Sequence, residues 1–154
     1  YSALDGVMTL TLIKSGIEPN PTADQEEHTF TYALYPHAEG WRQANTVQEA
    51  MKLNQPLLSE DGGHAGCQNS FVWVDKLNVI IETVKMAEDD DGIIVRLYES
   101  ENAKTKAHIF FGEKISSVES CNCLEEIKQT IETDGEGFEI TVKPYEIQTY
   151  RVRF

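Results

Sequence analysis

Residues 78–99 constrain the fold more than any other part of the sequence. They read NVIIETVKMAEDDDGIIVRLYE, in which two runs rich in β-branched residues flank a short acidic segment. In the second run Ile93, Val95 and Leu97 occupy alternate positions, which is the period of a strand with one buried face. The first run is apolar on both faces, so we expect it to be the more central strand. Asp91 and Gly92 favour a tight turn, and the segment therefore predicts an antiparallel hairpin.

Alternating apolar and polar residues predict further strands along the chain. The predicted strands cover residues 8–12, 30–34, 71–73, 107–111, 114–118, 138–142 and 145–154. Leu124, Ile127 and Ile131 also fit helical spacing, but we favour a strand there. Short strands separated by turns about every ten residues are typical of an antiparallel β-sandwich, so the predicted fold class is all-β.

One short helix is predicted among these strands. Thr46 and Glu49, three residues apart, fit a capping box, and apolar residues follow at helical spacing over 47–54. Pro56 should stop this helix. Residues 59–69, SEDGGHAGCQN, are rich in glycine and lack periodicity, so we place the junction between two structural units there.

The charge balance limits the classes of partner. The 154 residues include 26 acidic and 13 basic side chains, and the net charge is −13. Such a surface repels the phosphates of nucleic acids and anionic membranes, so we expect neither as a partner, whereas neutral sugars remain open. No apolar run reaches the length of a membrane span. Three cysteines, an odd number, and the absence of an N-glycosylation sequon favour a reduced, cytoplasmic setting.

The acidic residues 88–91 invite comparison with a calcium-binding loop, because hard cations prefer several carboxylate oxygens. Aligning Gly92 with the invariant glycine of such a loop puts Ala87 at the first ligand position and Tyr98 at the last. Neither residue carries a carboxylate. We therefore expect a solvated hairpin loop that holds no calcium.

Cys121 and Cys123 form a C-x-C pair that could contribute thiolates to a metal site. The next candidate ligands, His64 and Cys67, lie in a distant loop. Structural zinc sites normally use two paired motifs, and only one is present here. We expect all three cysteines to be free thiols.

No complete active site is visible in the sequence. The four histidines form no metal-binding helical pair, and no serine lies in a G-x-S-x-G motif. Carboxylates are so abundant that any chosen glycosidase pair would be uninformative. Trp41 and Trp73 have rings that can stack on a sugar, but for Trp73, which alternates with Phe71, core packing is the favoured interpretation.

Longer strings of residues carry more information than the composition does. They are ADQEEH at 23–28, FTYALYPH at 30–37, LNQPLL at 53–58, VIIETVKMAEDDDGIIVRLYE at 79–99 and PYEIQTYRV at 144–152. In this order, and over nearly the whole chain, they resemble the C-terminal region of glycoside hydrolase family 38 α-mannosidases.

The resemblance implies a division of roles within a larger enzyme. In that family an upstream α/β domain holds a zinc ion and the aspartate nucleophile of a retaining mechanism, and neither belongs to this stretch. Residues 1–70 would close the large β domain, and residues 71–154 would form a small C-terminal β-sandwich. The chain would then be a fragment without a cofactor or catalytic residue of its own. Its partner would be the upstream catalytic domain of the same chain, through which it would serve mannose-containing glycans.

The resemblance also implies residues at the rim of the sugar site. In some relatives a basic residue in the turn after the first strand reaches this rim, and here Lys14 with Gly16 replaces the arginine-proline turn that is frequent in the family. Lys14 keeps the charge but loses the bidentate hydrogen bonding of arginine. Asp24 and His28 complete the set of rim candidates, in a string where relatives often carry glycine at position 26.

Three functions are compatible with these patterns. The first is the non-catalytic β region of a cytosolic α-mannosidase, inactive by itself. The second is an independent carbohydrate-binding module, which needs exposed aromatic side chains on one face of the sandwich. The third is a small standalone enzyme that uses an acidic pair or the C-x-C site. We also expect the isolated chain to self-associate, because without the rest of the larger sheet it would expose Phe30, Tyr32 and Leu34 or their neighbours.

Overall fold

The computed structural model describes residues 1–55, 57–59, 61 and 70–154. The chain forms two compact units, Tyr1–Pro36 and His37–Phe154. The predicted junction at 59–69 lies mostly outside the described residues, so the division into 1–70 and 71–154 stays a prediction. Within the described ranges, no helix is both long and apolar enough to span a bilayer.

The first unit contains one short hairpin. Strands β1 (Ser2–Leu4) and β2 (Val7–Thr9) pair antiparallel. Asp5 and Gly6 between them both have positive φ angles, as a two-residue type I′ turn requires. The strand predicted at 8–12 is therefore only partly correct, because it begins at Val7 and ends at Thr9.

The second strand predicted for this unit is wrong, because residues 30–34 form no strand. Apolar alternation is not sufficient for a strand, which also needs a neighbour to share its backbone hydrogen bonds. In the described part of this unit, the only paired strands are β1 and β2. Phe30, Tyr32 and Leu34 are 43%, 70% and 74% exposed. The segment thus has the pattern of a strand without a sheet to join.

Helix α1 (Thr46–Asn54) confirms the predicted helix but not its capping box. Thr46 is the first helical residue, whereas a capping side chain belongs to the non-helical residue before it. That position is held by Asn45, which has a left-handed backbone conformation and makes no side-chain capping bond. The helix ends before Pro56, as predicted.

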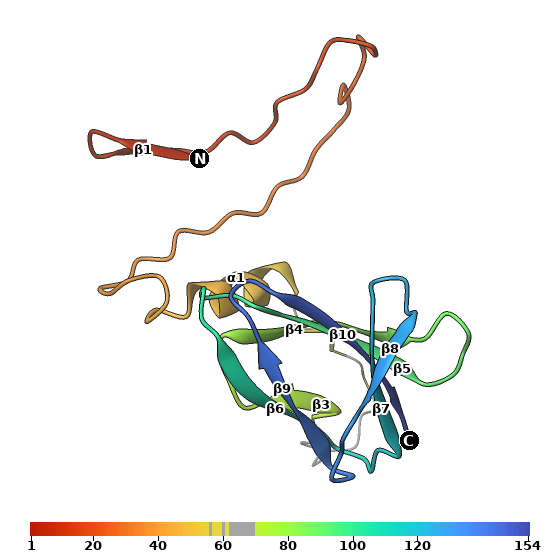
Figure 1. Cartoon of the computed structure of the whole chain (residues 1–154). Coiled ribbons are helices and arrows are strands. Elements are labelled where there is room, and N and C mark those ends of the chain that lie inside the picture. Colours follow the sequence, from red (N-terminus) through yellow and green to blue (C-terminus); the bar gives the residue numbers. More distant parts are fainter. Residues whose placement is uncertain (56, 60, 62–69) are drawn as a thin grey trace. The chain divides into compact units, whose positions relative to one another are not determined.

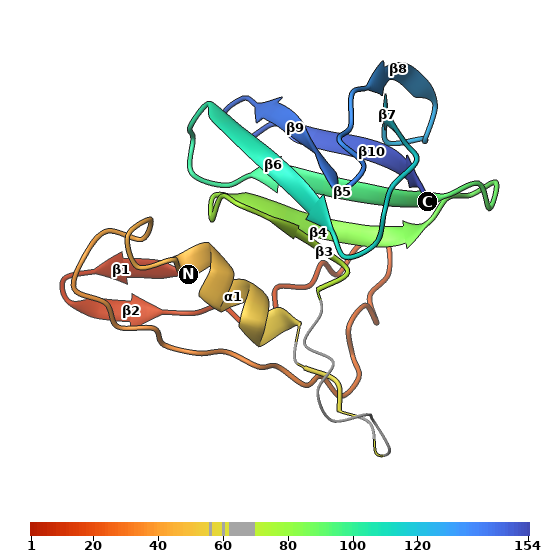
Figure 2. The same ribbon diagram turned by 90° about the horizontal axis from the view of Figure 1, so that it is seen from below.

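The second unit contains two antiparallel sheets, which confirms the predicted all-β sandwich. One sheet has the strand order β4-β5-β10-β7-β8 and the other the order β3-β6-β9. Figure 1 shows β3, β6 and β9 in one layer, and Figure 2 shows the same strands from below. The strands are β3 (Val72–Val74), β4 (Val79–Met86), β5 (Ile93–Glu99), β6 (Thr105–Phe111), β7 (Ser117–Cys121), β8 (Ile127–Ile131), β9 (Gly137–Val142) and β10 (Ile147–Arg153).

The hairpin predicted over residues 78–99 is confirmed as β4 and β5, with Val79 opposite Glu99. However, β4 lies at the edge of its sheet, whereas β5 lies between β4 and β10, so the prediction of a more central first strand is wrong. Val84 lies opposite the core residue Val95 and is still 44% exposed, because an edge strand is open on one side. Apolar residues on both faces therefore did not indicate a central position.

The turn between β4 and β5 requires glycine at one position. Gly92 has a φ of +91°, and a Cβ atom there would lie 2.5 Å from the backbone oxygen of Val152. The other positive φ in this turn, 59°, belongs to Asp90 and not to Asp91, which corrects the predicted dipeptide. Gly92 is thus needed both for its backbone conformation and for the close approach of β10.

The remaining strand predictions differ mainly at their ends. The strand predicted at 114–118 is observed as β7, which starts at Ser117 and extends to Cys121. Ile115 is buried, but its N–H donates to the carbonyl of Gly135 in a loop and not to a sheet neighbour. The ambiguous residues 124–131 contain a strand, β8, which confirms the favoured interpretation.

The hydrophobic core lies between the two sheets. Its centre is Phe138, 1% exposed, whose ring centroid lies 4.9 Å from that of Tyr150 and 6.2 Å from that of Phe111. The buried core residues are Val79, Val95, Leu97, Ala107, Ile109, Phe111, Ile115, Val118, Phe138, Ile140, Val142, Tyr150 and Val152. Both sheets contribute, so each strand's opposite face is left for other contacts.

Candidate functional site

The three predicted rim residues lie in the first unit, and all three are exposed. Asp24 has a positive φ of 56°, and its backbone carbonyl accepts a hydrogen bond of 3.0 Å from Nε2 of His28. The His28 ring also stacks against Phe30, at 6.1 Å between centroids. The fold thus brings Asp24 and His28 together, while among the described residues no hydrogen bond or ion pair joins Lys14 to either. Their role at a sugar site stays a prediction.

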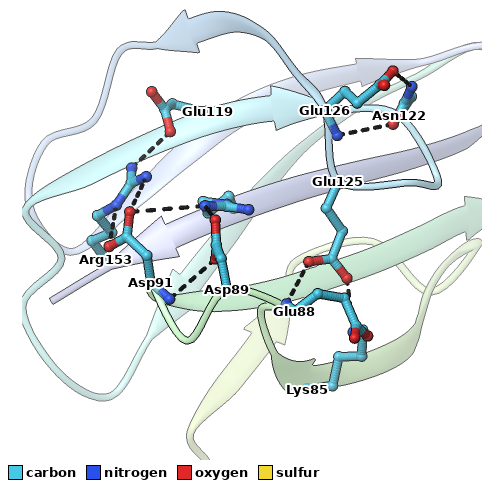
Figure 3. A network of polar contacts seen from close by, with 10 residues as sticks. Lys85, Glu88, Asp89, Asp91, Glu119, Asn122, Glu125, Glu126 and Arg153 are labelled. Carbon is cyan, nitrogen blue, oxygen red and sulfur yellow. Dashed lines mark hydrogen bonds and ion pairs between the residues drawn. The ribbon is translucent and has the colours of Figure 1, made fainter.

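The acidic loop between β4 and β5 is tied to β10 by ion pairs (Figure 3). Asp89 accepts a bond of 2.7 Å from Nη1 of Arg151. Asp91 accepts two bonds from Arg153, of 2.9 Å from Nε and 2.7 Å from Nη2. These guanidinium groups hold the pKa of both carboxyls below their usual range. Both carboxylates therefore neutralise fixed cations within the fold.

The loop between β7 and β8 meets this acidic loop (Figure 3). Glu125 accepts a bond of 2.8 Å from the backbone N–H of Glu88, and its other oxygen lies 2.7 Å from Nζ of Lys85. The ion pair with Lys85 and the hydrogen bond from the Glu88 backbone lower the pKa of the Glu125 carboxyl. Conversely, the carboxylates of Glu125 and Glu88 raise the pKa of Lys85. The two loops are thus joined by charge and hydrogen bonds.

The two thiols of the C-x-C pair have different environments, and both are free. Cys121 is buried in a small cluster with Ala87 and Ile94, and this burial raises the pKa of its thiol. Cys123 is exposed. Cys67 lies outside the described residues. In the part of the chain that the structure describes, no three His, Cys, Asp or Glu side chains are arranged to hold a metal ion.

Trp73 corrects another prediction, because it lies outside the core and is 41% exposed. Val72 and Val74 pack against the core from β3, so Trp73 between them faces outward. Its ring is nearly parallel to that of Phe110, directly opposite on β6, with 5.4 Å between centroids. The His108 ring lies a further 4.2 Å from Phe110. We call Trp73, Phe110 and His108 the aromatic row.

An open cleft of about 560 Å³ adjoins the aromatic row at His108. Asp134 at its edge accepts bonds of 2.9 Å and 2.8 Å from the N–H groups of Glu136 and Gly137, which lower the pKa of its carboxyl. The second oxygen of Asp134 lies 3.9 Å from Nε2 of His108. No sequence signal predicted this cleft, because it forms only where His108 of β6 meets β8, β9 and the loop between them, more than 20 residues further along the chain.

Glu99 is a buried carboxylate that the sequence patterns did not single out. It is 0% exposed and accepts bonds from the side chain of Asn78 (2.9 Å) and the backbone N–H groups of Glu101 (2.8 Å) and Tyr145 (3.1 Å). Burial alone would raise the pKa of Glu99, but these hydrogen bonds outweigh it and hold the pKa below its usual value. Because its donors come from three segments, Glu99 joins parts of the fold and is not free for chemistry.

The chain is similar to known α-mannosidases. It is 31% identical to "Alpha-mannosidase G" of Dictyostelium discoideum over 98% of this chain and 15% of the relative. It is 27% identical to "Alpha-mannosidase 2C1" of Mus musculus over 96% of this chain and 15% of the relative. It is 30% identical to the protein of the same name from Homo sapiens over 80% of this chain and 12% of the relative. The chain therefore spans only 12–15% of the length of these curated relatives.

Residues 78–150 also match the family described as "Glycosyl hydrolases family 38 C-terminal beta sandwich domain". The match begins at the β4–β5 hairpin and ends within β10, so it contains every strand of the second unit except β3 and the end of β10. The antiparallel sandwich observed here agrees with that description. Residues 78–150 of this chain therefore belong to the C-terminal β-sandwich domain of glycosyl hydrolase family 38.

Proposed function

We propose that this chain is the non-catalytic C-terminal β region of an α-mannosidase, in which it supports the catalytic domain and the rim of the sugar site. The parent enzyme would hydrolyse terminal α-mannosides with retention of configuration. Similarity to a curated α-mannosidase along 98% of the chain supports this proposal. Catalysis itself would depend on the upstream domain of the same protein.

The observation that carries the proposal is the exposed apolar pattern of the first unit. Tyr32 and Leu34 lie in a segment with strand alternation and are largely exposed, and the only sheet of this unit is a hairpin of two three-residue strands. In a folded protein, a segment in which apolar residues alternate in this way normally has its apolar face buried in a sheet. We infer that residues 30–34 join a sheet of the larger β domain of the parent.

The zinc ion implied for the parent does not fit the described residues of this chain, which offer no set of three ligands. We therefore assign no zinc ligand and no catalytic step to them. Lys14, Asp24 and His28 are proposed only as rim residues, since their exposed side chains can contact a neighbouring domain or the sugar bound there.

Hydrolysis of an aryl α-mannoside tests the proposal. The assay compares this chain with a protein extended upstream to include the catalytic domain, both with added zinc or cobalt. We expect turnover only in the extended protein, because the nucleophile would lie upstream. Metal-dependent turnover by this chain alone, above a mock-purified control, would contradict an accessory role.

A matched pair of variants tests the sheet contact. Leu34→Asp in the extended enzyme should reduce its thermal stability and its activity, because a charge would enter a buried face. Leu124→Asp provides the control, since Leu124 is 80% exposed in the β7–β8 loop of the second unit. Equal, negligible effects of the two substitutions would show that Leu34 remains exposed in the parent and would refute the inferred contact.

The second candidate function, a carbohydrate-binding module, is favoured by one observation. The aromatic row places an exposed tryptophan on the outer face of a sheet, as such a module requires. The third candidate, a standalone enzyme, finds no support in the described residues, since the acidic loop is engaged in ion pairs and the C-x-C thiols have no metal-site companions.

A further inference from the structure

The aromatic row lies on the outer face of β3 and β6, where Trp73 is 41% exposed beside Met51 of α1 and Phe110 and His108 are half-buried. Trp73 projects from β3, and Phe110 and His108 project from β6, on the side opposite the core residues Ile109 and Phe111. The centroid separations of 5.4 Å and 4.2 Å make the three rings one continuous surface. Aromatic residues exposed in this way are typical of binding surfaces, where they stack on a ligand.

The cleft at the end of the row supplies fixed polar groups. One oxygen of Asp134 is held by two backbone N–H groups, which leaves the other directed toward Nε2 of His108. Glu139 also lines the cleft and pairs through one oxygen with Lys106 at 2.8 Å. A Cβ atom at position 137 would lie 2.6 Å from Nε2 of His108, so Gly137 leaves space for the imidazole.

These groups match the chemistry of a pyranose ring. Its C–H face can stack on an aromatic ring, and its hydroxyl groups donate hydrogen bonds to carboxylate oxygens. Glu132 joins Asp134 and Glu139 in the cleft lining, and the whole chain carries a net charge of −13, so an anionic ligand would be repelled. We propose that the aromatic row and the adjoining cleft bind a neutral pyranoside.

The binding of a neutral sugar is argued from this geometry alone, whereas the choice of mannosides as first probes rests on the proposed function. The two can fail separately. Hydrolysis by the upstream-extended enzyme tests the proposed function, and a sugar titration of this chain tests the site. A glucoside is therefore included beside methyl α-mannoside and an α-linked mannobiose, since binding of any of them supports the pyranoside class.

Tryptophan fluorescence gives a direct readout because the chain contains only two tryptophans, Trp41 and Trp73. The Trp41→Phe variant leaves Trp73 as the sole reporter; Trp41 does not line the cleft, and its ring lies against the guanidinium group of Arg42. We expect saturable changes in Trp73 emission on titration with a neutral sugar, and calorimetry should give the same dissociation constant. Titration of the unchanged chain by calorimetry checks that Trp41→Phe leaves the affinity unaltered.

Two substitutions locate the site. Trp73→Ala should weaken binding about tenfold by removing the stacking surface. Asp134→Asn keeps an oxygen for the two backbone N–H groups but removes the free carboxylate oxygen, and a several-fold loss is expected. Thermal unfolding of both variants verifies the fold. If Trp73→Ala does not fold, Asp134→Asn carries the test.

The proposal is overturned by any of three results. The first is that none of the three sugars binds saturably at sugar concentrations of tens of millimolar. A dissociation constant of this size corresponds to a binding free energy of only about −2 to −3 kcal/mol. The second is binding that a folded Trp73→Ala or Asp134→Asn variant leaves unchanged. The third is a response only to a cationic probe such as spermidine, which would reflect the negative charge of the cleft and not recognition of a sugar.

Discussion

Replacing Glu99 with glutamine should destabilise the second unit strongly, although the two side chains have almost the same shape. The carboxylate accepts bonds from Asn78 and Glu101 on one oxygen and from Tyr145 on the other. The glutamine amide can keep its oxygen toward the first two donors, but its NH₂ group then faces the N–H of Tyr145. The substitution thus removes one hydrogen bond to a charged acceptor and leaves a buried donor unpaired.

The expected cost is about 2–4 kcal/mol in the free energy of unfolding, from about 1.5–3 kcal/mol for the charged hydrogen bond and a partly overlapping cost for the unpaired N–H. Urea unfolding at pH 7, followed by circular dichroism, measures this difference if the slope of free energy against urea concentration is unchanged. Glu113→Gln is the control, since Glu113 is exposed and should change stability by less than about 0.5 kcal/mol.

The pH dependence of this difference has a defined sign. The pKa of Glu99 is lower in the folded chain than its ordinary value of 4.5, so the charged carboxylate stabilises the fold above that pH. This stabilisation is lost as the pH falls through the lower, folded pKa. The difference in unfolding free energy between wild type and Glu99→Gln should therefore be largest at pH 7 and decrease below pH 4.5. A gap no larger than that of Glu113→Gln, or one that widens in acid, would refute the reasoning.

Four further outcomes are expected. Phe138→Ala should cost about 3–5 kcal/mol in urea unfolding, because it opens a cavity at the centre of the core; a loss below 1 kcal/mol would place Phe138 elsewhere. Gly92→Ala should cost about 1–3 kcal/mol by the same measurement, because of its positive φ and the close backbone of β10, and an unchanged midpoint would contradict this. Iodoacetamide should modify Cys123 in the folded chain much faster than the buried Cys121, as peptide mass spectrometry can determine, and equal rates would argue against the buried cluster. Lys14→Met in the upstream-extended enzyme should raise KM for a mannoside more than it lowers kcat, whereas unchanged steady-state constants would remove Lys14 from the rim.

The sequence predicts best those elements whose periodicity is reinforced by turn residues. Two signals predict the β4–β5 hairpin: the alternation of Ile93, Val95 and Leu97, and the glycine turn just before them. Both agree with the observed pairing. The period of two indicates which residues share a face, but not which neighbours a strand has. For this reason the pattern predicts a central position for β4, which lies at an edge, and a strand at residues 30–34, which have no strand partner.

Features that depend on contacts between distant segments could not be predicted from the sequence. Trp73 has the apolar character of a core residue, and only the packing of Val72 and Val74 shows that its own face is the outer one. Glu99 appears in the sequence as one acid among many, and its importance comes from donors up to 46 residues away. The cleft beside His108 likewise exists only when the loop before β9 lies next to β6.

The order of strands in the five-stranded sheet has a consequence for synthesis. β10, which lies between β5 and β7, is made after all of its sheet neighbours. Until it leaves the ribosome, the sheet exists only as two separate hairpins, β4–β5 and β7–β8, each with an open edge toward the missing strand. Chain termination anywhere before Ile147 would leave both edges unpaired, so such products should be recognised by chaperones and degraded.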